Sequence, residues 1–177
     1  MKKTYKVALC GILSAMQLVI LLAAYFPYLT YALPAIAGCL TIPLVIDIGK
    51  KYAFMSYLCV SLLSVLMCEK EAMLFYIFFF GYYPILKAVI EQIKSIKIVW
   101  ILKLLIATTA FCSAYFVSTF VLGIDVEALG EFGKYTTLIM VVLYDIFFIL
   151  YDRALSGLVL LYIQKYRKII RKFLNQK

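Results

Sequence analysis

Three charged residues interrupt an apolar stretch near the end of the sequence: Asp145, Asp152 and Arg153. Inside a membrane-spanning helix each would cost about 2.5 to 3.5 kcal/mol on the insertion scale, so each needs water, a partner or a ligand. Asp145 and Asp152, seven residues apart, share one helix face, and Arg153 can lean toward it. Asp145 could bind a cationic or hydroxylated ligand, or a proton. The alternative is a polar clamp between helices, with the Arg153 side chain extended toward the cytoplasm.

No known catalytic constellation accompanies these charges. The chain has no histidine, no G-x-S-x-G motif and no phosphate-binding loop before a helix. Its five cysteines show no C-x-x-C spacing and lie in or beside apolar stretches, where cysteine behaves as a small hydrophobic residue. The sequence therefore predicts a protein that is not an enzyme and that holds neither a metal nor a cofactor.

Tyrosine is abundant, with 15 residues, and several tyrosines fall where an outer membrane interface is expected. Aromatic belts at membrane interfaces explain such positions without any ligand. The uncharged segment 25–31, Tyr-Phe-Pro-Tyr-Leu-Thr-Tyr, could instead fold back over a pocket. In that case the candidate substrate-binding residues are Tyr28, Tyr31, Tyr76, Tyr115, Tyr144 and Asp145.

The composition indicates which class of structure carries these side chains. The 177 residues are 66% hydrophobic and 15% charged, with a mean hydropathy of +1.02, whereas soluble domains are about half apolar and a quarter charged. Backbone groups in hydrocarbon must be paired internally, and stretches such as 138–150 lack the polar–apolar alternation of barrel strands. We therefore expect an all-α integral membrane protein, with residues 1–177 forming a single membrane domain.

Apolar stretches between charged clusters predict six membrane-spanning helices, at residues 7–25, 29–46, 52–67, 73–90, 98–122 and 137–162. Pro34 and Pro43 predict a bent or broken second helix, and Gly81 with Pro84 a similar weak point in the fourth. The lysines before the first stretch resemble those of a signal peptide. That stretch continues to Tyr25 without a small-x-small cleavage site, so we expect it to be retained as a span.

Basic residues set the orientation, because they are retained on the cytoplasmic side. They gather at the N-terminus, at Lys50–Lys51, at Lys94 and Lys97, and in the tail 163–177, whereas the intervening connections carry most of the acidic residues. Six spans with both termini in the cytoplasm satisfy every connection. We expect a multi-pass protein of the plasma membrane whose basic tail binds anionic lipid. A specific partner is the alternative for the tail, and nothing resembles a nucleic-acid module.

A strip of small residues marks the first predicted helix. Gly11 and Ala15 are four residues apart, with Cys10 and Ser14 beside them, so another helix could approach closely there. Spacing alone favours a contact with another span of this chain over docking to another protein.

In layout the chain resembles the substrate-binding S component of an energy-coupling-factor (ECF) vitamin transporter. Those proteins are similarly small six-span bundles with both termini inside. Their first helix docks on a membrane coupling subunit through an A-x-x-x-A strip, which is similar to Gly11-xxx-Ala15 with glycine in place of the first alanine. The tyrosine- and proline-rich segment 25–34 also resembles the family's lid over the substrate pocket.

The resemblance implies a membrane subunit of an ABC importer that captures a vitamin or other small nutrient from outside. Energy would then come from separate ATPase subunits acting through the coupling subunit at Gly11 and Ala15, since the chain has no nucleotide-binding motif. The alternative is a non-catalytic membrane scaffold or assembly protein of Gram-positive bacteria. The run Phe78–Lys87 resembles uncharacterised small membrane proteins of those organisms.

Overall fold

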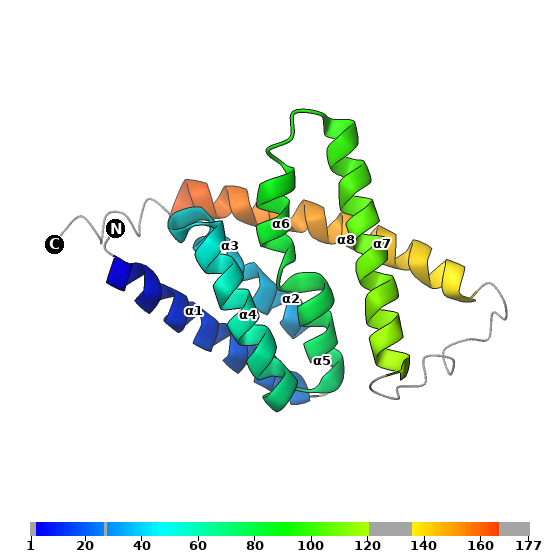
Figure 1. The fold of residues 1–177 in the computed structure, drawn as a ribbon, viewed down its shortest axis with the longest axis horizontal. Coiled ribbons are helices and arrows are strands. Elements are labelled where there is room, and N and C mark those ends of the chain that lie inside the picture. Colours follow the sequence, from blue (N-terminus) through cyan, green and yellow to red (C-terminus); the bar gives the residue numbers. More distant parts are fainter. Residues whose placement is uncertain (1–2, 27, 121–135, 167–177) are drawn as a thin grey trace.

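The computed structural model describes residues 3–26, 28–120 and 136–166, and these residues form helices and short connections without a β-strand (Figure 1). Five helical segments are long and apolar enough to cross a membrane: Lys3–Tyr25, Lys50–Met67, Lys70–Ile90, Ile96–Phe120 and Ile139–Lys165. A sixth, Ala32–Ile48, is apolar but shorter. An all-helical chain of the kind found in membranes is therefore confirmed for the described residues.

The elements follow the predicted spans closely, and their bounds are α1 (Lys3–Leu22), η1 (Ala23–Tyr25), α2 (Ala32–Cys39), α3 (Thr41–Pro43), η2 (Leu44–Ile48), α4 (Lys50–Met67), α5 (Lys70–Phe75), η3 (Tyr76–Phe80), α6 (Tyr83–Ile90), α7 (Ile96–Phe120), α8 (Thr136–Leu161) and η6 (Tyr162–Tyr166). The side chains of residues 136–138 and 166 lie outside the description.

The second span is broken, as its prolines predict. Proline lacks an N–H and its ring clashes with the carbonyl four residues earlier, which for Pro43 belongs to Cys39, the last residue of α2. The chain turns at Leu40 and resumes as α3 and the π-helical segment η2. Pro34 is tolerated because it lies in the first turn of α2, where its missing N–H would have no partner.

The fourth span is also interrupted where glycine and proline predict it. The π-helical η3 ends at Phe80, Gly81 and Tyr82 form a turn, and Pro84 is the second residue of α6. A Cβ at Gly81 would lie 2.8 Å from the Tyr57 ring. Glycine is therefore required at this turn because the side chain of α4 lies against it.

Contacts at the ends of the helices show which ends lie together. Near the start of α1, Lys6 Nζ lies 5.6 Å from the centre of the Tyr52 ring on α4. The Tyr162 hydroxyl after α8 donates a hydrogen bond to Asp47 in η2. One end of the molecule therefore gathers the start of α1, the η2–α4 connection and the end of α8 (Figure 1).

At the opposite end, the connection after α1 is tied to the connection between α4 and α5. The hydrogen bonds run from Tyr25 Oη to Met67 O (3.1 Å), from Thr30 Oγ1 to Glu69 Oε2 (3.2 Å) and from Tyr31 Oη to Glu71 Oε2 (3.1 Å). We call these six residues the outer clasp, after the side on which the charge pattern predicts them. The up-and-down order of α1, α2–η2 and α4 agrees with the predicted alternation.

Candidate functional site

The most polar part of the described interior lies where α6, α7 and α8 meet. Asp152 of α8 is only 3% exposed, and its carboxylate accepts hydrogen bonds from Tyr83 and Lys87 of α6 and from Lys103 of α7. The Lys103 ammonium lies 2.9 and 3.0 Å from the two carboxylate oxygens. Both lysines are themselves buried. Asp152 thus acts as the polar clamp between helices that the sequence suggested as one alternative.

Glu91, the residue that caps α6, completes the arrangement. Its Oε1 lies 3.1 Å from Lys87 Nζ and 2.8 Å from Lys103 Nζ, so a single oxygen bridges both ammonium groups. The Glu91 side chain is 46% exposed, whereas those of Lys87, Lys103 and Asp152 are almost completely buried. We call Lys87, Glu91, Lys103 and Asp152 the ion cluster; it holds two positive and two negative charges.

Further contacts hold the two lysines in place. Lys87 Nζ also donates to the Asp152 carbonyl at 3.0 Å and to Ser156 Oγ at 2.8 Å. Lys103 Nζ lies 5.4 Å from the centre of the Trp100 ring, a cation–π contact within α7. Removing water from paired charges is costly, and such pairs persist only when their remaining donors and acceptors are satisfied. The ion cluster meets that condition through groups on all three helices.

Sequence reasoning missed Lys87, Glu91 and Lys103. The cluster draws its carboxylates from two places, Glu91 directly after α6 and Asp152 in α8. A signal was available: Lys87 and Lys103 both fall inside predicted spans, and a lysine there needs a counter-charge. Arg153, beside Asp152, is exposed on the surface of α8.

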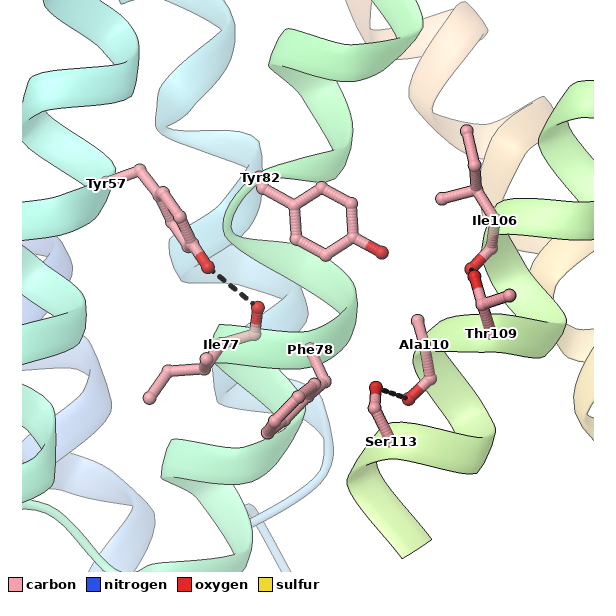
Figure 2. A pocket seen from close by; sticks show the side chains of 8 residues that line it. All are labelled: Tyr57, Ile77, Phe78, Tyr82, Ile106, Thr109, Ala110 and Ser113. Carbon is pink, nitrogen blue, oxygen red and sulfur yellow. Dashed lines mark hydrogen bonds between the residues drawn. The ribbon is translucent and has the colours of Figure 1, made fainter. Parts of the chain in front are cut away.

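A groove with a volume of about 440 Å³ opens between α4, η3 and α7. Figure 2 shows Tyr57 and Tyr82 on one wall and Thr109 and Ser113 of α7 on the other. The Tyr57 hydroxyl donates to the Ile77 carbonyl at 2.9 Å. None of the six predicted substrate-binding residues lines this groove.

Two of those six, Tyr144 and Asp145, lie in the first half of α8. The Tyr144 ring packs between Phe79 and Phe111, with centroids 4.9 and 5.1 Å away. Asp145 is partly buried, and within the described residues its Oδ1 is shielded from solvent without a hydrogen-bond partner. A carboxylate oxygen in that state needs a ligand or a proton, so the prediction for Asp145 keeps its physical basis.

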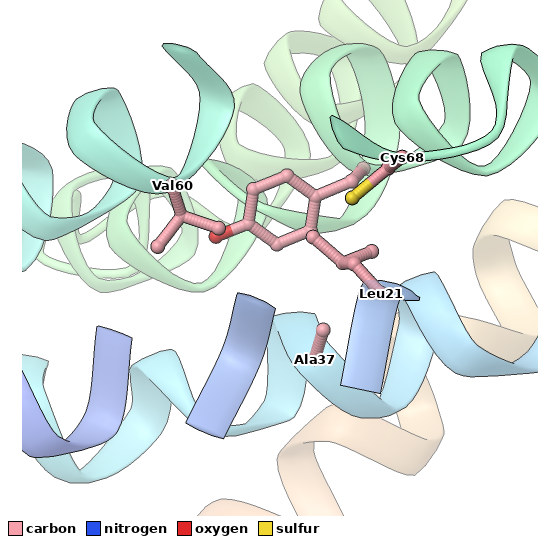
Figure 3. Close-up of a cluster of buried hydrophobic side chains, with 5 residues drawn as sticks. Leu21, Ala37, Val60 and Cys68 are labelled. Carbon is pink, nitrogen blue, oxygen red and sulfur yellow. The ribbon is translucent and has the colours of Figure 1, made fainter. Parts of the chain in front are cut away.

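Tyr76 and Tyr115 take different positions. Tyr76 is completely buried in a cluster with Leu21, Ala37 and Val60, in which side chains of α1, α2 and α4 meet (Figure 3). Its hydroxyl has no hydrogen-bond partner in the described part of the chain. Tyr115 is partly buried on α7. A ligand could reach Tyr76 only after these helices separate.

Tyr28 and Tyr31 lie on the surface of the connection between η1 and α2, 96% and 60% exposed. The hydrogen bond from Tyr31 to Glu71, reinforced by the charge of that carboxylate, raises the pKa of the Tyr31 hydroxyl. The hydroxyl therefore stays protonated at neutral pH and donates to Glu71 within the outer clasp. Tyr28 has a positive φ of 77°, an uncommon conformation for a residue other than glycine.

The six predicted residues thus do not form one pocket. Tyr28 and Tyr31 are at the surface, Tyr76 is in the core of the α1–α2–α4 half, and Tyr144 packs between η3 and α7. Their shared role in substrate binding stays a prediction, which would require the connection between η1 and α2 to move over the helices.

The small strip on α1 lies on an exposed face of the described molecule. Gly11 and Ala15 are exposed, and a Cβ at Gly11 would meet no atom within 4 Å. The neighbouring Ser14 makes the internal contact instead, with its Oγ 2.5 Å from Ser56 Oγ on α4. The expectation that Gly11 and Ala15 pack against another span of this chain is therefore wrong. Spacing could not tell which stripe of an apolar helix faces inward.

No group of His, Cys, Asp and Glu side chains in the described ranges could hold a metal ion. No family model matches the chain, and it has no significant likeness to a curated protein or to a solved structure. Function therefore has to be argued from the arrangement of the residues themselves.

Proposed function

We propose that this chain is the substrate-binding membrane subunit of an ECF-type importer, which captures a vitamin or other small nutrient from outside and depends on separate coupling and ATPase subunits. The exposed strip at Gly11 and Ala15 carries the proposal. A helix surface with no bulky side chains lets another helix approach its backbone closely, and in lipid such packing drives association. The described helices leave this strip uncovered.

The charge pattern and the helix ends support the corresponding topology of six spans with cytoplasmic termini. The end that gathers Lys6, Lys50 and Lys51 is the basic one, and basic residues are retained in the cytoplasm. The outer clasp then faces outside, with Glu69 and Glu71 in it. In this topology the short segment Ala32–Ile48 counts as the second span.

Docking is tested by replacing Gly11 or Ala15 with Leu in the full chain and purifying it from its native membranes. We expect the coupling and ATPase subunits to be lost from the purified complex because bulk blocks the helix contact. Met16→Phe is the matched control, since it adds bulk to an exposed position on another stripe of α1. Equal recovery of partners with Ala15→Leu and Met16→Phe would contradict docking through this strip.

The topology is tested separately, with single cysteines at positions 51 and 95 in a cysteine-free background. Position 51 lies at the start of α4 and position 95 directly before α7, at helix ends that we place in the cytoplasm. A membrane-impermeant thiol reagent should therefore modify them only after cells are opened. A single cysteine at position 71, in the outer clasp, serves as the control that should react in intact cells. Labelling of position 51 or 95 from outside would contradict the six-span topology.

A scaffold or assembly protein is the second candidate, and it is favoured by the scattering of the predicted substrate-binding residues over the surface, the core and α8. The strip and basic tail would then bind proteins and lipid without any nutrient. Mass spectrometry of the complex purified under native conditions separates the two candidates. A bound small molecule together with an ATPase supports the importer, whereas partners without either support the scaffold.

A further inference from the structure

The two lysines of the ion cluster are held unequally. With Glu91 set aside, Lys87 keeps the Asp152 carboxylate, the Asp152 carbonyl and Ser156 Oγ as acceptors. Lys103 keeps only the two oxygens of Asp152, at 2.9 and 3.0 Å. One carboxylate would then face two buried ammonium groups. Glu91 therefore supplies the negative charge that neutralises the cluster as well as a shared acceptor.

Glu91 is also the member of the ion cluster whose side chain can move away from the lysines into solvent. It is half exposed, and it follows the last turn of α6, where Gln92, Ile93 and Lys94 are exposed as well. No described segment covers this side of the cluster. Both ammonium groups meet at one carboxylate oxygen, which lies 3.1 Å from Lys87 and 2.8 Å from Lys103. An oxygen of another anion could occupy the same place.

We propose that the paired ammonium groups of Lys87 and Lys103 form a phosphate-binding site, in which Glu91 is a tethered carboxylate that a singly charged phosphate displaces. A monoanion replaces the Glu91 charge without disturbing neutrality, which a buried cluster requires. Lysine binds phosphate as a point charge and needs no paired geometry. The phosphate belongs either to the headgroup of an anionic phospholipid or to an ion in solution.

The site is independent of the proposed importer, because it rests on the ion cluster alone. Its location favours access by lipid, since Lys94 in the same connection and Lys97 at the start of α7 add positive charge close in sequence to Glu91. Anionic headgroups are attracted to such clusters at the membrane surface.

The single tryptophan of the chain provides a local readout. Trp100 lies within cation–π distance of Lys103, so its fluorescence should respond when the anion that binds Lys103 changes. The full chain, purified in an uncharged detergent, is titrated on the acidic side of neutrality, where inorganic phosphate is mainly a monoanion. The probes are a short-chain phosphatidylglycerol, the matching phosphatidylcholine and inorganic phosphate. We expect a saturable change with at least one of the phosphate monoanions and none with the zwitterionic phosphatidylcholine.

Glu91→Gln removes the competing charge while keeping the shape of the side chain. We expect the midpoint of the titration to fall by about tenfold relative to wild type, since one charged contact is typically worth that much. Glu71→Gln is the matched control, because it makes the same change of charge in the outer clasp, far from Trp100 in the sequence. The double variant Glu91→Gln/Lys87→Gln keeps Lys103 beside Trp100 and paired with Asp152, and it should lose the response because only one ammonium group remains.

The two possible sources of phosphate give different results. A response to phosphatidylglycerol alone assigns a lipid headgroup, a response to inorganic phosphate as well assigns a free anion, and either supports the site. An equal response to phosphatidylcholine would overturn it, and so would Glu91→Gln behaving like Glu71→Gln. If Glu91→Gln does not fold, the titration of the wild-type protein alone tests the site. Its fluorescence must change saturably with one phosphate monoanion and must not change with phosphatidylcholine.

Discussion

Each half of this molecule is held together by a different kind of polar contact. In the interior between α1, α2, α3 and α4 the side-chain hydrogen bonds are neutral: Gln17 Nε2 donates to the Ala37 carbonyl at 3.0 Å and to Thr41 Oγ1 at 2.9 Å, and Ser14 meets Ser56. Between α6, α7 and α8 they are charged and belong to the ion cluster.

The difference shows two ways to join helices where the solvent is as apolar as the interior. Burial of apolar side chains gives little association in lipid, so close packing and hydrogen bonds take its place. Neutral contacts can be lost one at a time at small cost. A charged cluster is interdependent, because removing one member leaves its partner buried without a counter-charge. The first half should therefore tolerate polar substitutions that the second does not.

The largest effect is expected for Asp152→Asn, which leaves Lys87 and Lys103 with only the half-exposed Glu91 as a counter-charge. We expect the free energy of unfolding to fall by about 3 to 5 kcal/mol, enough to prevent folding or to lower the unfolding temperature steeply. Thermal unfolding in detergent measures it. Arg153→Gln is the control, since it removes an exposed charge at the adjacent position. Similar unfolding temperatures for the two variants would show that the ion cluster does not stabilise α6–α8.

A smaller loss of stability is expected for Gly38→Ala, which tests close packing in the half that contains α2. The added Cβ would lie 2.5 Å from the Phe80 carbonyl oxygen, so α2 and η3 would have to separate, at a cost of about 1 to 3 kcal/mol. Gly11→Ala is the matched control because its Cβ meets nothing within 4 Å. If the two alanine variants unfold at the same temperature, the close approach of α2 to η3 is not a source of stability.

Asp145→Asn distinguishes a ligand site from a structural charge in the half that contains the ion cluster. Asn keeps the shape and removes the charge. If the chain is the importer subunit that we propose, it should still fold while its affinity for the nutrient falls about tenfold, or roughly 1.4 kcal/mol. Binding of the molecule identified in the native complex and thermal stability should be measured on the same purified variant. Reduced stability with unchanged affinity would make Asp145 a packing residue.

The smallest effect is expected for Gln17→Met. The substitution removes two hydrogen bonds, but it also removes Oε1, which has no partner among the described residues. Hydrogen bonds between membrane helices average about 0.6 kcal/mol, so the loss should be near 1 kcal/mol or less. The unfolding temperatures of Gln17→Met and Asp152→Asn, measured in the same detergent, are compared. A loss as large as that of Asp152→Asn would remove the distinction between neutral and charged contacts.

The positions of the helices could be predicted from the sequence because chain-local signals set them. The predicted sixth span ends at Tyr162 and α8 ends at Leu161. Pro43 marks the break in the second span and Gly81 the break in the fourth, through steric effects within a few residues.

Which side chains meet could not be predicted in the same way. A helix in lipid is apolar on its outer and inner faces, so periodicity does not reveal which stripe packs inward. Gly11 and Ser14 lie one turn apart on α1, yet only Ser14 contacts α4. The ion cluster depends on how α6, α7 and α8 are rotated against one another, which the spacing of Lys87, Lys103 and Asp152 leaves open. The same limit applies to the predicted outer pocket.

The connection between η2 and α4 has a consequence for how the protein is made. It consists of one residue, Gly49, whose φ of +116° is a conformation that residues with side chains rarely adopt. In the proposed topology one residue joins the second span to the third, so the two have to enter the bilayer together as a helical hairpin. The broken second span would thus be carried in by its partner, with Lys50 and Lys51 holding the hairpin's tip in the cytoplasm.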